Sequence, residues 1–168
     1  SDSIQYSTIE FLKDNKYDII FDDDNSGEIA DIVAIKFCEE EVTFEFYHCK
    51  YSHGDKPGAR VNDLYEVCGQ AEKSVEWKKD MSEVITRMIK RENARITSGK
   101  NSRFEVGDFS KLTEIKNRLK VFPAKLKIFI VQPGVSADKM TEDMNQILMA
   151  TDTYLHETYG VELGLICS

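Results

Sequence analysis

Residues 26–52, SGEIADIVAIKFCEEEVTFEFYHCKYS, constrain the fold more than any other stretch of this chain. They contain two runs rich in β-branched and aromatic residues, separated by three consecutive glutamates, and this is typical of neighbouring β-strands joined by a tight turn. The first run carries Asp31 and the second carries Lys50. The pattern therefore predicts a sheet built around a hairpin, with an acid on one strand and a lysine on the next.

The apolar patterns on either side of this hairpin predict further helices and strands. The expected elements are a helix at 3–15, strands at 17–21, 28–37 and 42–51, a helix capped by Asn62 and running to about 89, a mobile loop at 97–108, a helix from Ser110 to about 121, a strand at 125–132, a helix capped by Ser136 and ended by Gly160, and a strand at 161–166. Long helices between the later strands require crossover connections, so those strands are expected to run parallel. The predicted fold class is α/β, a mixed central β-sheet flanked by helices on both faces.

The size and composition fit one globular domain spanning residues 1–168, because 168 residues with 41% hydrophobic and 31% charged side chains can bury a substantial core. No window approaches the roughly 18 consecutive apolar residues of a membrane-spanning helix, and the polar start lacks the features of a signal peptide. We expect a cytoplasmic protein without a membrane partner. The chain does not begin with Met, so we expect a piece of a longer protein whose other domains are partners. The four scattered cysteines predict free thiols.

The charge of the chain is distributed very unevenly. The formal net charge is −8, yet residues 84–127 carry 12 Lys and Arg against 4 Asp and Glu, and the remaining residues carry 10 against 26. A basic segment of this kind predicts a surface that binds nucleic-acid phosphates, with Arg95 and Lys116 as candidates. A solvated helical surface is the alternative interpretation.

The register of the strand at 42–51 selects which side chains could do chemistry together. Side chains alternate along a strand, so His48 and Lys50 point to one face and Cys49 points to the other. A carboxylate on one strand beside a lysine on the next is an arrangement suited to metal-dependent phosphodiester hydrolysis. The carboxylate would hold the ion, and the lysine would orient water or offset the developing charge.

The segments GEIADIVAI and FYHCK resemble the signature of the PD-(D/E)XK, restriction-endonuclease-like nuclease superfamily. The core order of that superfamily, which is helix, three strands, helix and strand, matches residues 3 to about 132. The resemblance implies a DNA-cleaving nuclease that uses Mg²⁺ or Mn²⁺, with Asp31 as the metal-binding acid and Lys50 as the catalytic lysine. His48 stands where the superfamily has Glu or Asp, and an imidazole ligand favours Mn²⁺ over Mg²⁺.

The resemblance also suggests where a missing carboxylate could come from. Some members of the superfamily use an acid on the first helix or on the helix after the lysine strand, positions at which this chain has Glu10 and Glu66. Gln70 lies one turn beyond Glu66 and is a candidate catalytic residue, as in branches resembling recombination exonucleases. Glu28 is close to Asp31 in sequence but has the opposite strand parity, so a role as a ligand would need a local twist near Gly27, and a residue at the entry of the strand is the simpler interpretation.

The loop after Lys50 carries further cationic candidates. His53, Lys56 and Arg60 are placed to contact a phosphate backbone, and an exposed polar loop is the alternative interpretation. Arg60 is the strongest candidate of the three, because a guanidinium can donate two parallel N–H bonds to one phosphate. This loop, together with HCKYS and DLYEVCGQAEKS, resembles nuclease-like domains attached to bacterial helicase or restriction-type proteins.

Two functions and one minor alternative remain open from the sequence. The first is a metal-dependent nuclease acting on DNA. The second is a nuclease-fold module that is catalytically weak or inactive and binds nucleic acid or protein within a larger helicase or restriction-type protein. A zinc site using His48, Cys49 or His53 is the minor alternative, because adjacent residues on a strand point to opposite faces and cannot both bind one ion.

Overall fold

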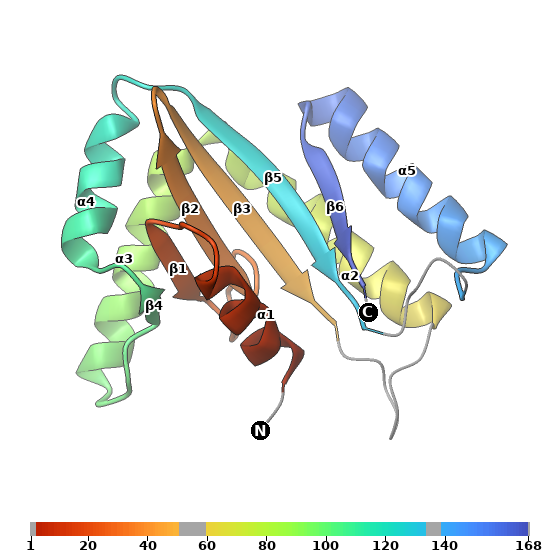
Figure 1. The fold of residues 1–168 in the computed structure, drawn as a ribbon, viewed down its shortest axis with the longest axis horizontal. Helices are drawn as coiled ribbons and strands as arrows, with labels where there is room; N and C mark the ends of the chain where they lie inside the picture. The colour runs from red at the N-terminus through yellow and green to blue at the C-terminus, as the bar shows by residue number, and fades with distance from the viewer. Residues whose placement is uncertain (1–2, 51–59, 134–138, 168) are drawn as a thin grey trace.

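Six strands form a single mixed sheet in the computed structural model, which describes residues 3–50, 60–133 and 139–167 (Figure 1). The strand order is β4-β1-β2-β3-β5-β6. The strands are β1 (Ile19–Asp22), β2 (Ile32–Cys38), β3 (Glu41–Cys49), β4 (Phe104–Val106), β5 (Ala124–Val131) and β6 (Glu162–Ile166). β1, β2 and β3 pair antiparallel, whereas β5 runs parallel to both β3 and β6. The predicted α/β class, with a hairpin followed by parallel crossovers, is confirmed.

The helices cover the two faces of the sheet unequally. They are α1 (Ile4–Lys13), α2 (Val61–Ser74), the 3₁₀ helix η1 (Val75–Lys79), α3 (Met81–Thr97), α4 (Phe109–Arg118) and α5 (Glu142–Tyr159). α2 to α5 share the larger core, which includes Phe44, Phe46 and Ile128 of the central strands. Among the helices of the described residues, α1 is the one that packs on the other face, over Ile20 and Tyr47. Alternation along each strand explains the division, because successive side chains enter opposite cores.

The helix predicted to run from residue 62 to about 89 is interrupted. Ser74 ends α2, one 3₁₀ segment follows, and the Asp80 side chain then accepts a hydrogen bond from the Glu83 N–H at 2.9 Å to begin α3. The apolar periodicity continues across this break, so it could not reveal the cap. Arg60, not Asn62, stands at the N-cap of α2.

Two further boundaries differ from the prediction. The segment 97–108 contains β4, which pairs with β1 at the edge of the sheet and so is not a loop throughout. The N-cap of α4 is Asp108, whose side chain accepts from the Lys111 N–H at 2.8 Å, and Ser110 lies inside the helix. Ser136 lies outside the described residues, and Thr141 caps α5. Gly160 ends α5 at φ +61°, as predicted.

Candidate functional site

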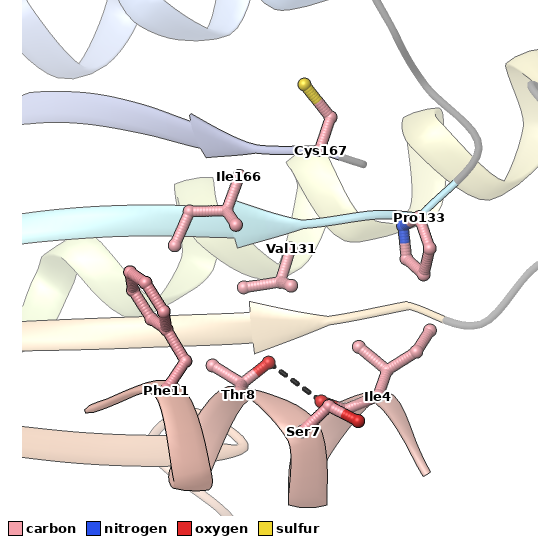
Figure 2. A pocket seen from close by; sticks show the side chains of 8 residues that line it. All are labelled: Ile4, Ser7, Thr8, Phe11, Val131, Pro133, Ile166 and Cys167. Atoms are coloured by element: carbon pink, nitrogen blue, oxygen red, sulfur yellow. Dashed lines mark hydrogen bonds between the residues drawn. The ribbon is translucent and has the colours of Figure 1, made fainter. Parts of the chain in front are cut away.

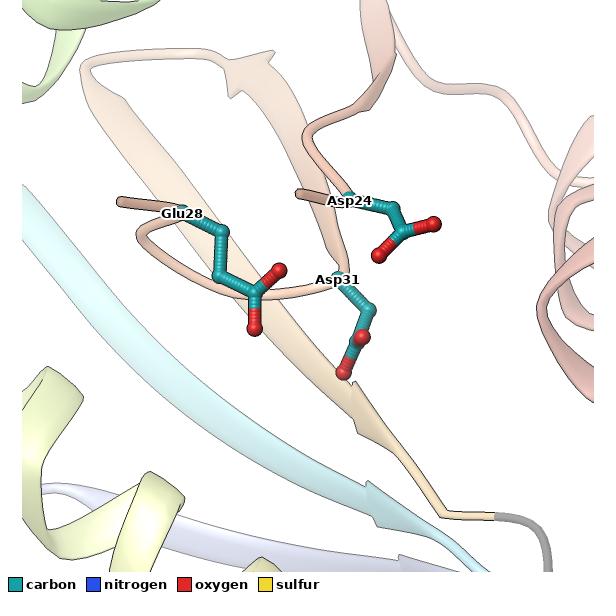
Figure 3. Close-up of side chains that lie close together, drawn as sticks. All are labelled: Asp24, Glu28 and Asp31. Atoms are coloured by element: carbon teal, nitrogen blue, oxygen red, sulfur yellow. The ribbon is translucent and has the colours of Figure 1, made fainter. Parts of the chain in front are cut away.

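Three carboxylates meet in the loop that joins β1 to β2. Oxygens of Asp24, Glu28 and Asp31 all lie within 4.8 Å of one another. Figure 3 shows the three side chains arising from this loop. Asp31 precedes β2, which starts at Ile32, so it is not on the strand as predicted, and the parity argument against Glu28 does not apply. The sequence DDDNSGE, which spans the end of β1 and the following loop, contains Asp24 and Glu28, and its high density of acids is the signal from which the cluster could be predicted.

Two residues with positive φ shape the loop. Asn25 has φ 128° and Gly27 has φ +82°, and glycine is the residue that adopts such a conformation without strain. The turn closes through a bond from the Glu28 N–H to the Asn25 carbonyl at 3.0 Å. The Glu28 carboxylate in turn accepts from the Asn25 N–H at 3.0 Å. The local sequence therefore folds Glu28 back toward Asp24 and Asp31.

Asp31 joins this loop to the end of β3. Its Oδ2 accepts a hydrogen bond from the Cys49 N–H at 2.8 Å, one residue before Lys50. The Gln5 side chain of α1 donates to the Asp31 carbonyl at 3.3 Å and to Asp22 Oδ1 at 2.8 Å. Burial raises the pKa of Asp31 to about 6, and the negative charges of Glu28 and Asp24 add to the rise although the Cys49 N–H opposes it. The cluster thus carries charge that a cation would stabilise.

Arginines of α3 hold the loop from its other side. Asp23 is fully buried, forms an ion pair with Arg91 and accepts from the Ile29 N–H at 2.8 Å. Arg91 also donates to the Asp23 carbonyl at 2.6 Å, and Arg87 donates to the Gly27 carbonyl. Both arginines belong to the basic segment that was expected to face solvent or DNA. Part of that charge instead neutralises and orders the acidic loop, and nothing in the local sequence indicated this pairing.

His48 is a buried side chain that supports α2. It is 3% exposed, and its Nε2 lies 2.8 Å from Ser74 Oγ. The Ser74 hydroxyl donates to the Ala71 carbonyl at 2.9 Å, so the histidine must be the donor in the first bond. Burial lowers the pKa of His48 to about 4 and keeps the ring neutral. Nε2 is therefore not available to bind a metal in this arrangement.

The zinc site that was the minor alternative from the sequence does not form from the described residues. Cys49 points to the opposite face from His48, where its thiol donates weakly to Thr8 Oγ1 at 3.9 Å. Burial raises the pKa of the Cys49 thiol to about 12, which disfavours the thiolate that zinc requires. His53 lies outside the described residues.

Lys50 and Glu66 form an ion pair at the end of β3. Lys50 Nζ lies 2.8 Å from Glu66 Oε1 on α2, and the two side chains are 18% and 55% exposed. His48 and Lys50 both reach α2, so the predicted side-chain register of β3 is confirmed. Glu66 neutralises the lysine here and lies outside the carboxylate cluster.

Gln70 lines a polar pocket beside the cluster. The pocket has a volume of about 250 Å³ and is bordered by Glu28, His48, Gln70, Lys73 and Trp77, among others. Gln70 Oε1 is buried and has no hydrogen-bond partner among the described residues. Since Glu28 belongs to both the pocket and the carboxylate cluster, the two form one continuous polar region.

The other predicted site residues are dispersed. Glu10 forms an exposed ion pair with Lys13 at 2.8 Å and is not part of the cluster. Arg60 is exposed and borders an open hollow with Glu66, and Lys56 lies outside the described residues. Lys116 donates to Thr86 Oγ1 at 2.7 Å between α4 and α3. Of the predicted metal ligands Asp31, His48, Glu66 and Glu10, only Asp31 belongs to the carboxylate cluster.

A larger pocket lies on the α1 side of the sheet but offers little chemistry (Figure 2). It has a volume of about 280 Å³ between α1, β5 and β6, and its walls include Ile4, Phe11, Val131 and Ile166. Thr8 uses its hydroxyl to donate to the Ile4 carbonyl at 2.7 Å. Cys167 is the one titratable residue among those that line it. The candidate site is therefore the carboxylate cluster with its neighbouring polar pocket.

Comparisons with known proteins supply no identity for the chain. Neither a family model, nor a curated protein, nor a solved structure matches it. Within the described ranges, none of the helices has the length and apolar character needed to cross a membrane.

Proposed function

We propose that this domain hydrolyses phosphodiester bonds of DNA in a reaction that depends on Mg²⁺ or Mn²⁺. The observation that carries the proposal is the meeting of the Asp24, Glu28 and Asp31 carboxylates within 4.8 Å. Carboxylate oxygens are hard donors of the kind these ions prefer, so the donor set fits. The resemblance of the element order and of Asp31 and Lys50 to the PD-(D/E)XK superfamily supports the same proposal.

The residues at the site have separable roles in this proposal. The three carboxylates would hold the ion, which when bound would polarise the phosphate and lower the pKa of a water. The Cys49 N–H keeps Asp31 in place. Lys50, the next residue, offsets the negative charge that grows on the phosphate as water attacks phosphorus and the bond to the leaving oxygen breaks. Glu66 competes for the Lys50 ammonium, so substrate must displace that ion pair.

Gln70 is suited to orient the attacking water. Its buried Oε1 lacks a partner among the described residues, and Gln70 is one of the residues that line the pocket together with Glu28. An unpaired buried carbonyl oxygen is costly, and a hydrogen bond from water would satisfy it. His48 acts through packing and through its bond to Ser74, and takes no part in metal binding in this scheme.

A catalytically inactive module is the second candidate. Two observations favour it: Lys50 is paired with Glu66, and the position of the expected acid is occupied by a neutral, buried histidine. In this case the fold binds nucleic acid or protein within a larger helicase or restriction-type protein. Calorimetric titration with Mn²⁺ separates the candidates, because the module predicts no heat of binding at millimolar metal.

Cleavage of plasmid and single-stranded DNA with Mn²⁺ or Mg²⁺ tests the nuclease proposal. Asp31→Asn keeps the acceptor for the Cys49 N–H but removes a ligand, and we expect cleavage to fall more than about 100-fold. Lys50→Ala is expected to lower the rate about 10²- to 10³-fold, the cost of losing one preorganised electrostatic group.

Glu10→Gln is the matched control, because it also removes one carboxylate charge but lies outside the cluster. Its cleavage rate is expected to equal that of the wild type. Wild-type cleavage rates in both Asp31→Asn and Lys50→Ala would reject the nuclease assignment. A large loss of cleavage in Glu10→Gln would mean that the metal site includes Glu10.

A further inference from the structure

A second polar pocket, different from the candidate site, is lined by positive charge. It has a volume of about 270 Å³ and is bordered by Arg91 and Arg95 of α3, Lys100, Arg103 and Asn25. No carboxylate is among the residues that line it. Four cationic side chains around one hollow make a strongly positive surface in a chain whose formal net charge is −8.

The internal contacts of the fold satisfy only part of this charge. Arg91 is paired with Asp23. Arg95 donates its Nε to the Asn101 carbonyl at 2.8 Å, and this acceptor carries no formal charge. Within the described residues, the structure gives the Lys100 ammonium neither a hydrogen bond nor an ion pair. The pocket therefore keeps positive charge that an anion could bind.

Arg103 is the strongest indication that this pocket takes a ligand. It is 7% exposed, and its Nη1 donates to the Asp22 and Asp24 carbonyls at 2.9 and 3.1 Å. Its buried Nε has no hydrogen-bond partner in the described parts of the chain. Burial lowers the pKa of Arg103, and the neighbouring charges of Arg91 and Arg95 act in the same direction. An anion would both accept from the guanidinium and relieve this repulsion.

Helix capping explains some of these cations but not the set. Arg95 lies in the last turn of α3, where a positive charge interacts favourably with the helix dipole. Lys100 follows the helix, and Arg103 lies beyond it, next to β4, so neither is placed by that effect. Contacts with the acidic loop account for Arg91 and Arg103, but within the described residues neither these contacts nor helix capping account for Lys100.

The pocket and the carboxylate cluster both include residues of the loop that joins β1 to β2. Asn25 lines the pocket, its neighbour Asp24 belongs to the cluster, and Arg103 bonds the Asp24 carbonyl directly. We propose that the pocket of Arg91, Arg95, Lys100 and Arg103 binds a phosphate group of the DNA strand whose scissile phosphodiester lies at the carboxylate cluster. This proposal rests on the proposed nuclease function and names where the strand is anchored beside the cleaved bond.

Inorganic phosphate is the first probe, because it contains the binding group without the rest of the strand. In the metal-free protein with EDTA, we expect phosphate to shift the amide resonances of Lys100 and Arg103, followed by NMR. Lys100→Glu is expected to weaken phosphate binding at least about fivefold, the factor given by one charge contact at a protein surface. Unchanged resonances around the pocket at saturating phosphate would overturn the proposal.

Lys120→Glu is the charge-matched control. Lys120 follows α4 and donates to Asn117 Oδ1 at 3.0 Å. Figure 1 shows the end of α4 at the top of the view and the connection from α3 to β4 at the bottom. The phosphate affinity of Lys120→Glu is expected to equal that of the wild type. An equal loss in Lys100→Glu and Lys120→Glu would mean that phosphate responds to overall charge only, and would also overturn the proposal.

Single-stranded DNA then tests whether the phosphate belongs to a strand. Binding in EDTA, followed by fluorescence anisotropy over a range of salt, is expected to show a salt slope lower by about one in Lys100→Glu than in Lys120→Glu. Oligonucleotides with and without a 5′-phosphate distinguish a terminal phosphate from an internal one. Equal slopes in the two variants would show that the pocket takes free phosphate and not the strand, which overturns the assignment to DNA.

The two proposals fail in distinguishable ways. If Asp31→Asn cleaves DNA at the wild-type rate while Lys100→Glu alone weakens phosphate binding, the nuclease assignment falls and the anion pocket stands. If Asp31→Asn abolishes cleavage and phosphate leaves the pocket resonances unchanged, the nuclease stands and the pocket assignment falls.

Discussion

Asp31 combines a fixed position with an unfavourable charge. The Cys49 N–H holds its carboxylate, while burial and the neighbouring Glu28 and Asp24 raise its pKa from 3.8 to about 6. The folded protein therefore binds a proton at Asp31 more tightly than the unfolded chain does. Ionisation of Asp31 therefore lowers the stability of the folded protein, and a bound cation would offset this cost.

The pH dependence of stability tests whether the ionised Asp31 carboxylate destabilises the fold. Above pH 6 the wild type bears the full cost of ionising Asp31, and the cost disappears as the pH falls to about 4, since the group is then protonated in the folded state. Asp31→Asn is expected to raise the free energy of unfolding at pH 7.5 in EDTA, by on the order of 1 kcal/mol. The gain should vanish near pH 4 in urea unfolding. A variant less stable than the wild type at pH 7.5 would contradict the inferred repulsion.

The acidic loop is ordered by contacts with helices that are distant in sequence. Arg87 and Arg91 of α3 bond its carbonyls, Gln5 of α1 bonds the Asp31 carbonyl, and Arg103 bonds the Asp24 carbonyl. These contacts hold the three carboxylates together despite their repulsion. The helix α3 thus has two roles: Arg87 and Arg91 hold the acidic loop, and Arg91 and Arg95 border the cationic pocket.

The variant Arg91→Ala tests how much the ion pair between Arg91 and Asp23 contributes to the free energy of unfolding. It would leave the fully buried Asp23 without its ionic partner, and breaking a buried pair from one side costs about 3–5 kcal/mol. Lys90→Ala on the same helix is the control, because Lys90 is exposed, and a change within about 0.5 kcal/mol is expected. Both are measured by urea unfolding. Adding Asp23→Asn to Arg91→Ala should recover part of the loss, and no recovery would contradict the ionic explanation.

The whole molecule is built on a sheet whose two faces are covered unequally. α2 to α5 pack on one face, and α1 is the helix of the described residues that packs on the other face, where it shares the smaller core with residues of the strands (Figure 1). α1 also carries Gln5, which reaches the acidic loop. The stability of the smaller core and the position of the site therefore depend on the same helix.

Leu12→Ala tests this dependence. Leu12 is 1% exposed at the centre of the smaller core, and removing its side chain is expected to lower the free energy of unfolding by about 2–5 kcal/mol. Phe11→Ala, at a neighbouring position that is 59% exposed, should change it by less than about 0.5 kcal/mol. Chemical denaturation compares the two variants, and similar losses would mean that α1 is not held by its Leu12 face.

The helices and strands with a clear apolar spacing were predicted well from the sequence. The boundaries between them and the short segments that connect them were not. α1, β5, β6 and the end of α5 at Gly160 follow from apolar spacing and one glycine. The break before α3 was missed because the apolar period continues past Asp80. β4 was missed because three residues make a weak pattern and its pairing with β1 is non-local.

The class of fold and the side-chain register of β3 could be predicted from the sequence alone. These follow from short-range periodicity and from the pairing of consecutive strands. The three-dimensional structure was needed to show that Asp24 and Glu28 accompany Asp31, that His48 and Glu66 do not, and that arginines of the basic segment order the acidic loop. Such choices depend on how turns and helices distant in sequence meet in space, which local patterns do not encode.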